Sequence, residues 1–417
     1  MTPLRRNRDF VLLQLGQAFS TAGSESTAIA YPLLVLASTH SPEKAGIVGF
    51  ARIVPYALFA LLAGVAVDRW NRKRLMLLAD AARALAVGSI VVALAVDRLT
   101  FAQIPVVAFV EGTCFVLFNI AETGALRSVV PARQLPRAAA TEQSRISAVT
   151  LTGPPLGGAL FGLRRALPFL VDAISYAFSI VSLLAMRTPF QEERDAAPHG
   201  PMWTEVREGL GWLWHQRFLR TCALLFSGSN FAFEGLFLTL VVVGRRQGLS
   251  GGEIGALIAA FGACALAGSL AAPLFQRLFS MRTIVVGNFW IVLAVVAFVL
   301  DPSVYVLLAG ALPLAFFNPT LNSVVIGYRI AVVPDRLVGR VNSVARNMAL
   351  LAQPLGPLAA GFLLGSVSAR ATVAFFIACL LALAVWATLS PAIRDAPSLD
   401  ELDAPTPTPE ASRAAAG

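Results

Sequence analysis

Long apolar stretches, separated by short polar turns, run through almost the whole chain. An α-helix needs about 20 mostly apolar residues to cross a bilayer, at a rise of about 1.5 Å per residue. These stretches must be helical in the membrane, because hydrocarbon offers no partner for open backbone groups. The pattern predicts twelve transmembrane spans, at residues 10–38, 44–67, 73–96, 101–128, 138–162, 166–186, 218–244, 252–277, 282–300, 303–331, 338–364 and 370–390.

Two polar segments divide this pattern. Residues 202–216 mix tryptophans with charged residues, which indicates a helix on the inner membrane surface; a solvated connector is the alternative. The last residues are rich in Pro, Ala and acids, which is typical of a disordered tail. The predicted domains are an N-terminal six-helix bundle (1–190), a cytoplasmic linker with the interfacial helix (191–217), a C-terminal six-helix bundle (218–393) and a disordered cytoplasmic tail (394–417).

An internal repeat supports the division into two halves. Residues 119–162 return in degenerate form 203 positions later as residues 322–365, with no gap. Two similar halves with a site between them are a recurring plan of secondary transporters. We therefore predict an all-α integral membrane fold with two pseudo-symmetric six-helix bundles. The matched residues include Asn119 with Asn322 and the pair Gly153-Pro154 with Gly356-Pro357.

Composition agrees with a membrane protein. The chain is 57% hydrophobic and 14% charged, with a mean hydropathy of +0.71, whereas soluble domains carry roughly 25% charged residues. The net charge of +9 would suit a nucleic-acid partner, but the basic residues are scattered over short loops, so we expect none. The four cysteines lie in apolar segments without ligand or disulfide spacing, which predicts buried thiols.

The loop arginines favour one orientation. Cytoplasmic loops of membrane proteins carry an excess of Lys and Arg. With both termini inside, twenty basic residues fall on the inner side and seven on the outer side, although the pairs Arg164-Arg165 and Arg245-Arg246 oppose the trend. The first apolar stretch is too long for the apolar region of a signal peptide. We expect a multi-pass protein with both termini in the cytoplasm.

Two short motifs carry a family resemblance. Residues 64–74, between spans two and three, read Gly-Val-Ala-Val-Asp-Arg-Trp-Asn-Arg-Lys-Arg, and residues 153–158 in span five read Gly-Pro-Pro-Leu-Gly-Gly. Both resemble signatures of the major facilitator superfamily, the second being the one associated with its antiporters. Residues 7–34 resemble the drug and siderophore exporter branch, which includes macrolide-efflux-like and enterobactin-exporter-like proteins. The resemblance covers residues 5–390, although the corresponding loop of the second half, 273–282, has no acid.

The resemblance implies a location in the bacterial inner membrane and a role for each motif. Asp68 would latch the inner ends of the two halves by contacting span eleven; the alternative is a charge cluster that only sets topology. Glycines in span five allow close helix approach, and Pro154 interrupts the backbone ladder, so packing alone is the alternative to an antiport role. The gating-loop candidates are Gly64, Asp68, Arg69, Arg72, Lys73 and Arg74, and the antiporter-motif candidates are Gly153, Pro154, Gly157 and Gly158.

Acids inside the predicted spans are the main candidates for chemistry, because each costs on the order of 2.5–3.5 kcal/mol to insert. Glu25 and Glu234 lie about 16 residues into spans one and seven, and Glu111 lies near the middle of span four. In the superfamily, spans one, four, seven and ten line the cavity. We expect these acids, with Asn119 and Asn322, to serve proton coupling or to bind a cationic substrate. The alternative is that each acid only satisfies a polar contact between helices.

Other intramembrane charges indicate structural roles. Glu122 in span four and Arg145 in span five lie at similar depth, which predicts an ion pair. Arg52 and Asp172 lie toward the outer side of spans two and six. They would either belong to an outer gate or extend along the helix toward the interface.

The sequence contains no metal-ligand constellation, no Ser-His-Asp or Cys-His set and no phosphate-binding loop. We therefore expect no enzyme and no cofactor, with the bilayer and a small-molecule substrate as partners of a monomer. The predicted function is secondary active transport: proton-gradient-driven efflux of small amphipathic compounds (drug, antibiotic or siderophore-like) by alternating access. An importer or an uncoupled facilitator of the same fold is the alternative. A membrane enzyme or receptor is disfavoured, because no catalytic or ligand set clusters at one face.

Overall fold

A computed structural model describes residues 4–190 and 202–397 of the chain. The predicted linker residues 191–201 and most of the predicted tail lie outside this range, as do the side chains of a few helical residues, including Asp68. All the regular elements in the described range are helices. The long ones are α1 (Arg8–Thr39), α2 (Pro42–Arg69), α3 (Arg72–Ala95), α4 (Gln103–Val129), α5 (Leu135–Leu163), α6 (Leu167–Ala185), α7 (Met202–His215), α8 (Arg217–Arg246), α9 (Gly251–Leu278), α10 (Met281–Trp290), α12 (Val304–Val332), α13 (Val338–Leu350), α14 (Leu355–Ser366) and α15 (Ala369–Leu389).

Short helices complete the chain. They are η1 (Leu4–Arg6), η2 (Ala132–Gln134), η3 (Ile291–Val296), α11 (Ala297–Leu300), η4 (Asp335–Leu337) and α16 (Pro391–Arg394). The elements α10, η3 and α11 together form the ninth predicted span, and α13 with α14 forms the eleventh. The predicted interfacial helix is present as α7; its place on the membrane surface stays a prediction.

Polar side chains at the loops set several helix starts. The side chains of Asn7, Ser41 and Asn71 each accept a hydrogen bond from the backbone three residues later, and so cap α1, α2 and α3. Ser250 and Glu253 form a capping box at α9. These caps satisfy backbone donors that a helix end leaves open, which explains why the polar turns separate the spans so sharply.

Ten helical segments in the described residues are long and apolar enough to cross a membrane. They correspond to spans three to twelve of the prediction. The first two, α1 and α2, are not among them, although they are 32 and 28 residues long. In α1 the reason is polar content: Gln17, Ser20, Ser24, Ser26 and Thr27 are buried within the bundle, where neighbouring helices satisfy them.

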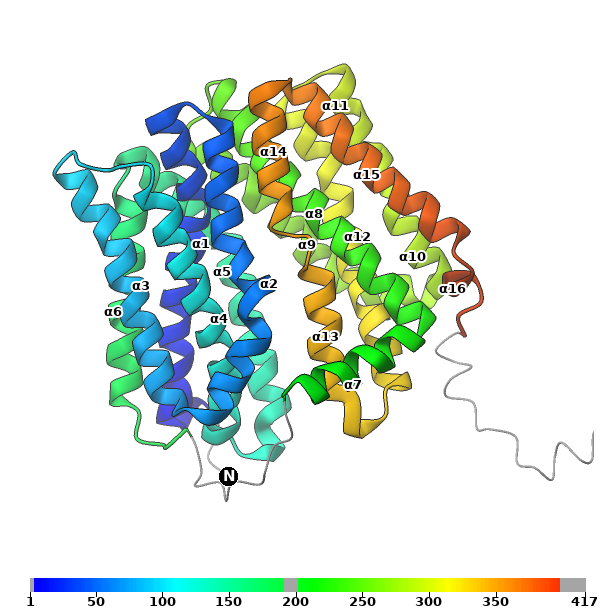
Figure 1. The fold of residues 1–417 in the computed structure, drawn as a ribbon, viewed down its shortest axis with the longest axis horizontal. Helices are drawn as coiled ribbons and strands as arrows, with labels where there is room; N and C mark the ends of the chain where they lie inside the picture. The colour runs from blue at the N-terminus through cyan, green and yellow to red at the C-terminus, as the bar shows by residue number, and fades with distance from the viewer. Residues whose placement is uncertain (1–3, 191–201, 398–417) are drawn as a thin grey trace, which may run out of the picture.

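The helices form two groups, α1–α6 and α8–α15, called here the N-terminal and C-terminal halves (Figure 1). We call the end that carries the α2–α3 loop the inner end, after the predicted orientation, and the opposite end the outer end. Figure 1 shows the two groups converging at the outer end and diverging toward the inner end. The residue boundaries predicted for the two bundles stay predictions.

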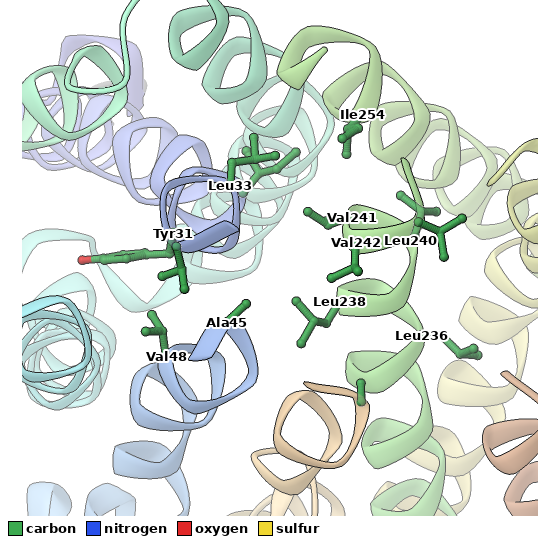
Figure 2. Packing of buried hydrophobic residues seen from close by; sticks show 14 of the residues in the cluster. Tyr31, Leu33, Ala45, Val48, Leu236, Leu238, Leu240, Val241, Val242 and Ile254 are labelled. Carbon is green, nitrogen blue, oxygen red and sulfur yellow. The ribbon is translucent and has the colours of Figure 1, made fainter. Parts of the chain in front are cut away.

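The buried apolar residues show the same arrangement. One cluster spans both halves at the outer end, and Figure 2 shows Leu33 and Ala45 facing Val241 and Leu238 across the interface. Two further clusters lie at the inner end, one within each half. The halves therefore share a core on the outer side only, and we call this conformation outer-closed.

Glycines make the outer contact close. At the crossing of α5 and α9, a Cβ atom added at Gly158 would overlap the backbone of Gly251, and one at Gly255 would lie 2.6 Å from the Pro154 carbonyl oxygen. At the crossing of α2 and α14, a Cβ at Gly361 would lie 2.6 Å from the Pro42 carbonyl oxygen. Main chain thus meets main chain at both crossings, as in membrane helix pairs with small residues at the interface.

One exception to the positive-inside trend has a structural reason. Arg246, at the outer end of α8, donates to the backbone carbonyl of Leu364 near the end of α14, at 2.9 Å. This bond satisfies a carbonyl group that the end of a helix leaves open. The arginine therefore supports packing at the outer end, where topology alone would not favour a positive charge.

Candidate transport cavity

A cavity of about 550 Å³ lies between the two halves. Its wall is mostly apolar and includes the aromatic rings of Phe233, Phe237 and Phe261. Polar groups enter it from both halves: Glu25, Arg52, Asn230, Glu234 and Asn318. The helices that supply this lining are α1, α2, α8, α9, α12 and α14. Volume and lining fit a small organic molecule with an apolar body and a polar group.

Two of the predicted acids face this cavity together. Glu25 comes from α1 and Glu234 from α8, so each half contributes one carboxyl group. The Gly-Pro pair of the repeat lies behind each of them. A Cβ added at Gly153 would overlap the Glu25 side chain, and one at Gly356 would lie 3.0 Å from Glu234 Cβ. The repeated motif therefore gives both acids the backbone space in which they sit.

Glu111 lies behind the cavity and is not among its lining residues. It is 2% exposed; Tyr31 donates a hydrogen bond to its Oε2 at 2.6 Å, and Arg52 Nη2 lies 3.6 Å from its Oε1. Arg52 does line the cavity and also donates to the Ser24 carbonyl oxygen at 3.1 Å. Glu111 thus contacts Arg52 and Tyr31, which both line the cavity, but does not line it itself, so direct substrate binding, which the sequence left open for it, does not fit this geometry.

A buried polar network continues from Ser24 into the N-terminal half. Arg83 donates to Ser24 Oγ at 2.9 Å and lies 3.3 Å from Asp80 Oδ1. The Arg83 guanidinium also lies 4.1 Å from the ring centroid of Tyr176. Asp172 is fully buried and accepts a hydrogen bond from Thr27 at 2.9 Å. Asp172 therefore belongs to this interior and does not extend toward the interface, one of the two roles predicted for it.

Neither of the predicted asparagines is among the residues that line the cavity. Asn119 is half-buried on α4, and its backbone oxygen accepts a bond from Thr123. Asn322 donates to Asn318 Oδ1 at 2.6 Å, and Asn318 faces the cavity. Asn322 therefore orients a cavity residue, which is a different role from the one the repeat suggested.

The motif between α2 and α3 lies at the inner end. Lys73 donates to the Met186 carbonyl oxygen at 2.8 Å, and Arg72 donates to that of Phe190 at 3.4 Å, so the basic run ties this loop to the end of the N-terminal half. Arg69 and Arg74 are exposed. No atom lies within 4 Å of a Cβ added at Gly64. The side chain of Asp68 lies outside the described residues, so its latch role stays a prediction.

The pair predicted between spans four and five is present. Arg145 Nη2 lies 3.1 Å from Glu122 Oε1, and both side chains are less than a tenth exposed. The charges lie within the N-terminal half, between α4 and α5. Their geometry fits a structural contact, apart from the cavity.

Two residues were overlooked in the sequence, one that joins the two halves and one that contacts Glu234 within the C-terminal half. The Arg346 guanidinium of α13 lies 5.4 Å from the ring centroid of Tyr56 on α2, a contact between the halves on the inner side of the cavity. Gln353 donates to Glu234 Oε1 at 2.7 Å. Arg346 could have been found by the rule that selected the glutamates, since it is a charge inside an apolar span. Gln353 carries no such signal.

Comparisons with known proteins identify the family. The family model of the Major Facilitator Superfamily matches residues 13–300. The chain belongs to the Major Facilitator Superfamily. As expected for this family, the protein is a multi-pass membrane transporter, and family and fold point away from an enzyme.

Its relatives include drug exporters. The chain is 26% identical to the Multidrug efflux pump Tap of Mycolicibacterium fortuitum over 414 residues, which covers 95% of this chain and 98% of that protein. It is 26% identical to Macrolide efflux protein A of Streptococcus pyogenes over 231 residues, 54% of this chain and 55% of that protein. The predicted resemblance to drug exporters of this superfamily is confirmed.

Solved structures share the fold. A bacterial homologue of the human lysosomal transporter Spinster, inward-facing and unoccupied, matches with a TM-score of 0.73 at 15% identity, covering 93% of this chain and 97% of that one. An inward-facing bacterial homologue of the iron transporter ferroportin matches with a TM-score of 0.71 at 14% identity, covering 93% and 99%. The predicted twelve-span, two-bundle architecture is confirmed as the Major Facilitator fold.

Proposed function

We propose that this transporter exports small amphipathic compounds, with cationic ones preferred, in exchange for protons. The observation that carries the proposal is the cavity, an apolar chamber into which each half projects one glutamate. Aromatic faces and carboxylates together bind organic cations well. The relatives named as multidrug and macrolide efflux proteins support a drug-like substrate.

The glutamates supply the coupling. A carboxyl group in a poorly solvated cavity binds a proton or a cation more readily than one in water, because a lone charge is costly there. Glu25 and Glu234 therefore take either a proton or the cationic group of a substrate, and the two ligands compete. Exchange of one for the other is antiport. Arg52 is the cationic group among the cavity-lining residues in the described range, and it keeps the empty site from holding two unopposed negative charges.

Alternating access follows from the two-bundle fold. In the outer-closed form, the cavity loads from the inner side. Rocking of one half against the other then separates the α5–α9 and α2–α14 crossings and exposes the cavity outside. The proposal needs no cofactor, since the proton gradient across the bacterial inner membrane drives the cycle, and a monomer with both termini inside suffices.

The test measures efflux of ethidium, a fluorescent organic cation, from cells with and without the protein and with and without a proton uncoupler. We expect the protein to lower ethidium accumulation and the uncoupler to abolish that effect. Glu25→Gln is expected to lower uncoupler-sensitive efflux by about tenfold or more, a loss of at least about 1.4 kcal/mol. Asp97→Asn, in an exposed loop, is the matched control.

Other outcomes point to the alternatives. Higher ethidium accumulation in cells that contain the protein would identify an importer. Efflux that persists in full with the uncoupler would identify a facilitator without proton coupling. Normal efflux by both Glu25→Gln and Glu234→Gln would remove the glutamates from the mechanism.

A further inference from the structure

Span eleven is broken at the depth of the cavity. Helix α13 ends at Leu350, and α14 begins at Leu355 after a turn. Pro354 explains the break, because proline has no backbone N–H to donate and its ring clashes with the carbonyl group four residues earlier. The corresponding residue of the first repeat is Leu151, and α5 runs through that position unbroken. The break therefore belongs to one half only.

Three side chains on one face of α8 hold the broken segment. Ser227 Oγ accepts from the Ala352 backbone N–H at 3.2 Å. Asn230 donates to the Ala349 carbonyl oxygen at 2.9 Å. Glu234 accepts from Gln353 at 2.7 Å. Ser227, Asn230 and Glu234 are spaced three and four residues apart, which places them in a row along the helix. Ser227 and Asn230 replace backbone partners that the interrupted ladder of span eleven lacks, whereas Glu234 holds the side chain of Gln353.

The two parts of span eleven contact different regions. Helix α14 belongs to the outer closure, where Gly361 meets α2. Helix α13 lies toward the inner end, where Arg340 pairs with Glu208 of α7 and Arg346 contacts Tyr56 of α2. Opening the outer end separates Gly361 from α2, whereas closing the inner end brings α13 toward the N-terminal half, so the two parts change their contacts in opposite senses. A break between them is where backbone torsions absorb such a change.

Glu234 is the ionisable member of the three α8 side chains, and it also lines the cavity. The charged groups that share the cavity lining with it are Glu25 of α1 and Arg52 of α2. A hydrogen bond to an ionised carboxylate is roughly twice as strong as a neutral one. The strength of the hydrogen bond between Glu234 and Gln353 therefore depends on whether the charge of Glu234 is free or neutralised by a ligand.

We propose that the Glu234–Gln353 hydrogen bond is a latch through which the cavity controls the break in span eleven. With the cavity empty and Glu234 ionised, the bond holds α13 in the outer-closed position. A proton on the Glu234 carboxylate, or an organic cation beside it, weakens the bond and frees α13 to move. This inference rests on the proposed function, because it takes protons and organic cations as the two ligands.

The latch would give the transporter an exchange rule. Either ligand neutralises Glu234 and permits the conformational change, whereas the empty carrier stays in place. An antiporter needs this rule, since free movement of the empty carrier would dissipate the proton gradient. A ligand shifts the equilibrium between the outer-closed and outer-open conformations only if it binds one of them more tightly. Here the difference in affinity comes from the Glu234–Gln353 hydrogen bond, which is present in the outer-closed conformation and competes with the ligand for the carboxylate. Gln353 is thus a positioning residue that acts through Glu234.

The test measures distances between spin labels on the full-length protein in proteoliposomes. Labels at positions 133 and 336, exposed in corresponding inner loops of the two halves, report opening of the inner end. The four native cysteines, Cys114, Cys222, Cys264 and Cys379, are first replaced. Spectra are recorded from pH 5 to pH 9, with and without tetraphenylphosphonium as the organic cation.

In the parent protein we expect the long-distance population to fall when either the pH is lowered or tetraphenylphosphonium is added. Gln353→Leu is expected to lower the ratio of the long-distance to the short-distance population about tenfold or more at high pH, the difference between a charge-assisted bond and none. Its remaining response to pH and cation is expected to be small. Glu234→Gln is expected to respond to neither ligand. Thr150→Leu, at the position that corresponds to Gln353 in the unbroken α5, is the matched control and should behave like the parent.

A parent-like response of Gln353→Leu to both ligands would overturn the latch. Should that variant not fold, Gln353→Asn withdraws the amide from Glu234 while keeping a polar side chain at this position and replaces it in the test. Ethidium efflux by the same variants separates the two proposals. Uncoupler-sensitive efflux with an unaltered distance response would reject the latch and keep the function. A distance response that needs Gln353, without uncoupler-sensitive efflux, would keep the latch and reject the proposed function.

Discussion

Gly153 of α5 packs so closely against Glu25 of α1 that a Cβ atom at position 153 would overlap the glutamate side chain. The Ser26 hydroxyl donates to the Gly153 carbonyl oxygen at 3.2 Å and fixes the same crossing. In the other half, a Cβ atom at Gly356 would overlap the Phe231 carbonyl oxygen and would lie 3.0 Å from Glu234 Cβ. The glycine that resembles the antiporter motif therefore determines where a cavity carboxylate stands.

Gly153→Ala should consequently impair both stability and transport. The added methyl group must push α1 away or turn Glu25, and overpacking of this kind costs about 1–3 kcal/mol. We expect a lower unfolding temperature in detergent and reduced ethidium efflux. Gly162→Ala on the same helix is the control, since nothing lies within 4 Å of a Cβ there. Equal effects of the two substitutions would show that the contact with Glu25 has no special weight.

A large side chain should lower the stability of the outer-closed form at one glycine of α2 and leave it unchanged at another. Gly46 meets α14 at the outer closure, where an added Cβ would lie 2.5 Å from the Pro357 carbonyl oxygen, whereas Gly64 near the inner end meets nothing in this conformation. Gly46→Leu should destabilise the outer-closed form. Gly64→Leu should leave its unfolding temperature unchanged and still block efflux, if the inner ends must meet later in the cycle. Normal efflux by Gly64→Leu would mean that this face stays open throughout.

Tyr31→Phe should destabilise the N-terminal half. It removes the hydroxyl that donates to Glu111 at 2.6 Å in a fully buried position, and hydrogen bonds to charged groups contribute about 1.5–3 kcal/mol. Thermal unfolding in detergent measures the loss. Tyr305→Phe is the control, because Tyr305 is 57% exposed. A loss no greater than that of the control would show that Glu111 relies on Arg52 alone.

The pair of Arg145 and Glu122 should show the asymmetry of buried ion pairs. Arg145→Met leaves a carboxylate without its partner, and breaking a buried pair costs about 3–5 kcal/mol. The double variant Arg145→Met/Glu122→Met removes both charges and should recover most of that loss. Unfolding curves of the two variants make the comparison. A double variant as unstable as the single one would point to another partner for one of these residues.

The sequence revealed the architecture because bilayer thickness sets span length. It also placed Glu25 and Glu234 together, since the resemblance implies that spans one and seven both line the cavity. It could not tell that Glu111 lies behind Arg52 and Tyr31 and does not line the cavity. Depth along a helix follows from residue number, whereas the face that a residue presents depends on how the helix is rotated within the bundle, and tertiary packing decides that.

The break in span eleven shows a different limit. Pro354 was visible in the sequence, but the apolar pattern continues through it, so residues 338–364 read as one helix. Other spans keep their course through interior prolines, as α12 does at Pro313 and Pro319. What decides the outcome is whether neighbouring side chains satisfy the freed backbone groups. Ser227 and Asn230 do so here, from a helix more than a hundred residues earlier.

The crossing of α5 and α9 has one further consequence. Gly158 and Gly251 bring main chain against main chain there, so the seal at that point contains no group that gains or loses a proton. Acidity or salt in the external medium cannot alter its strength through charge. The strength of this contact depends on the shape of the two backbones, whereas the neighbouring crossing of α2 and α14 also places the Glu43 side chain against Gly365.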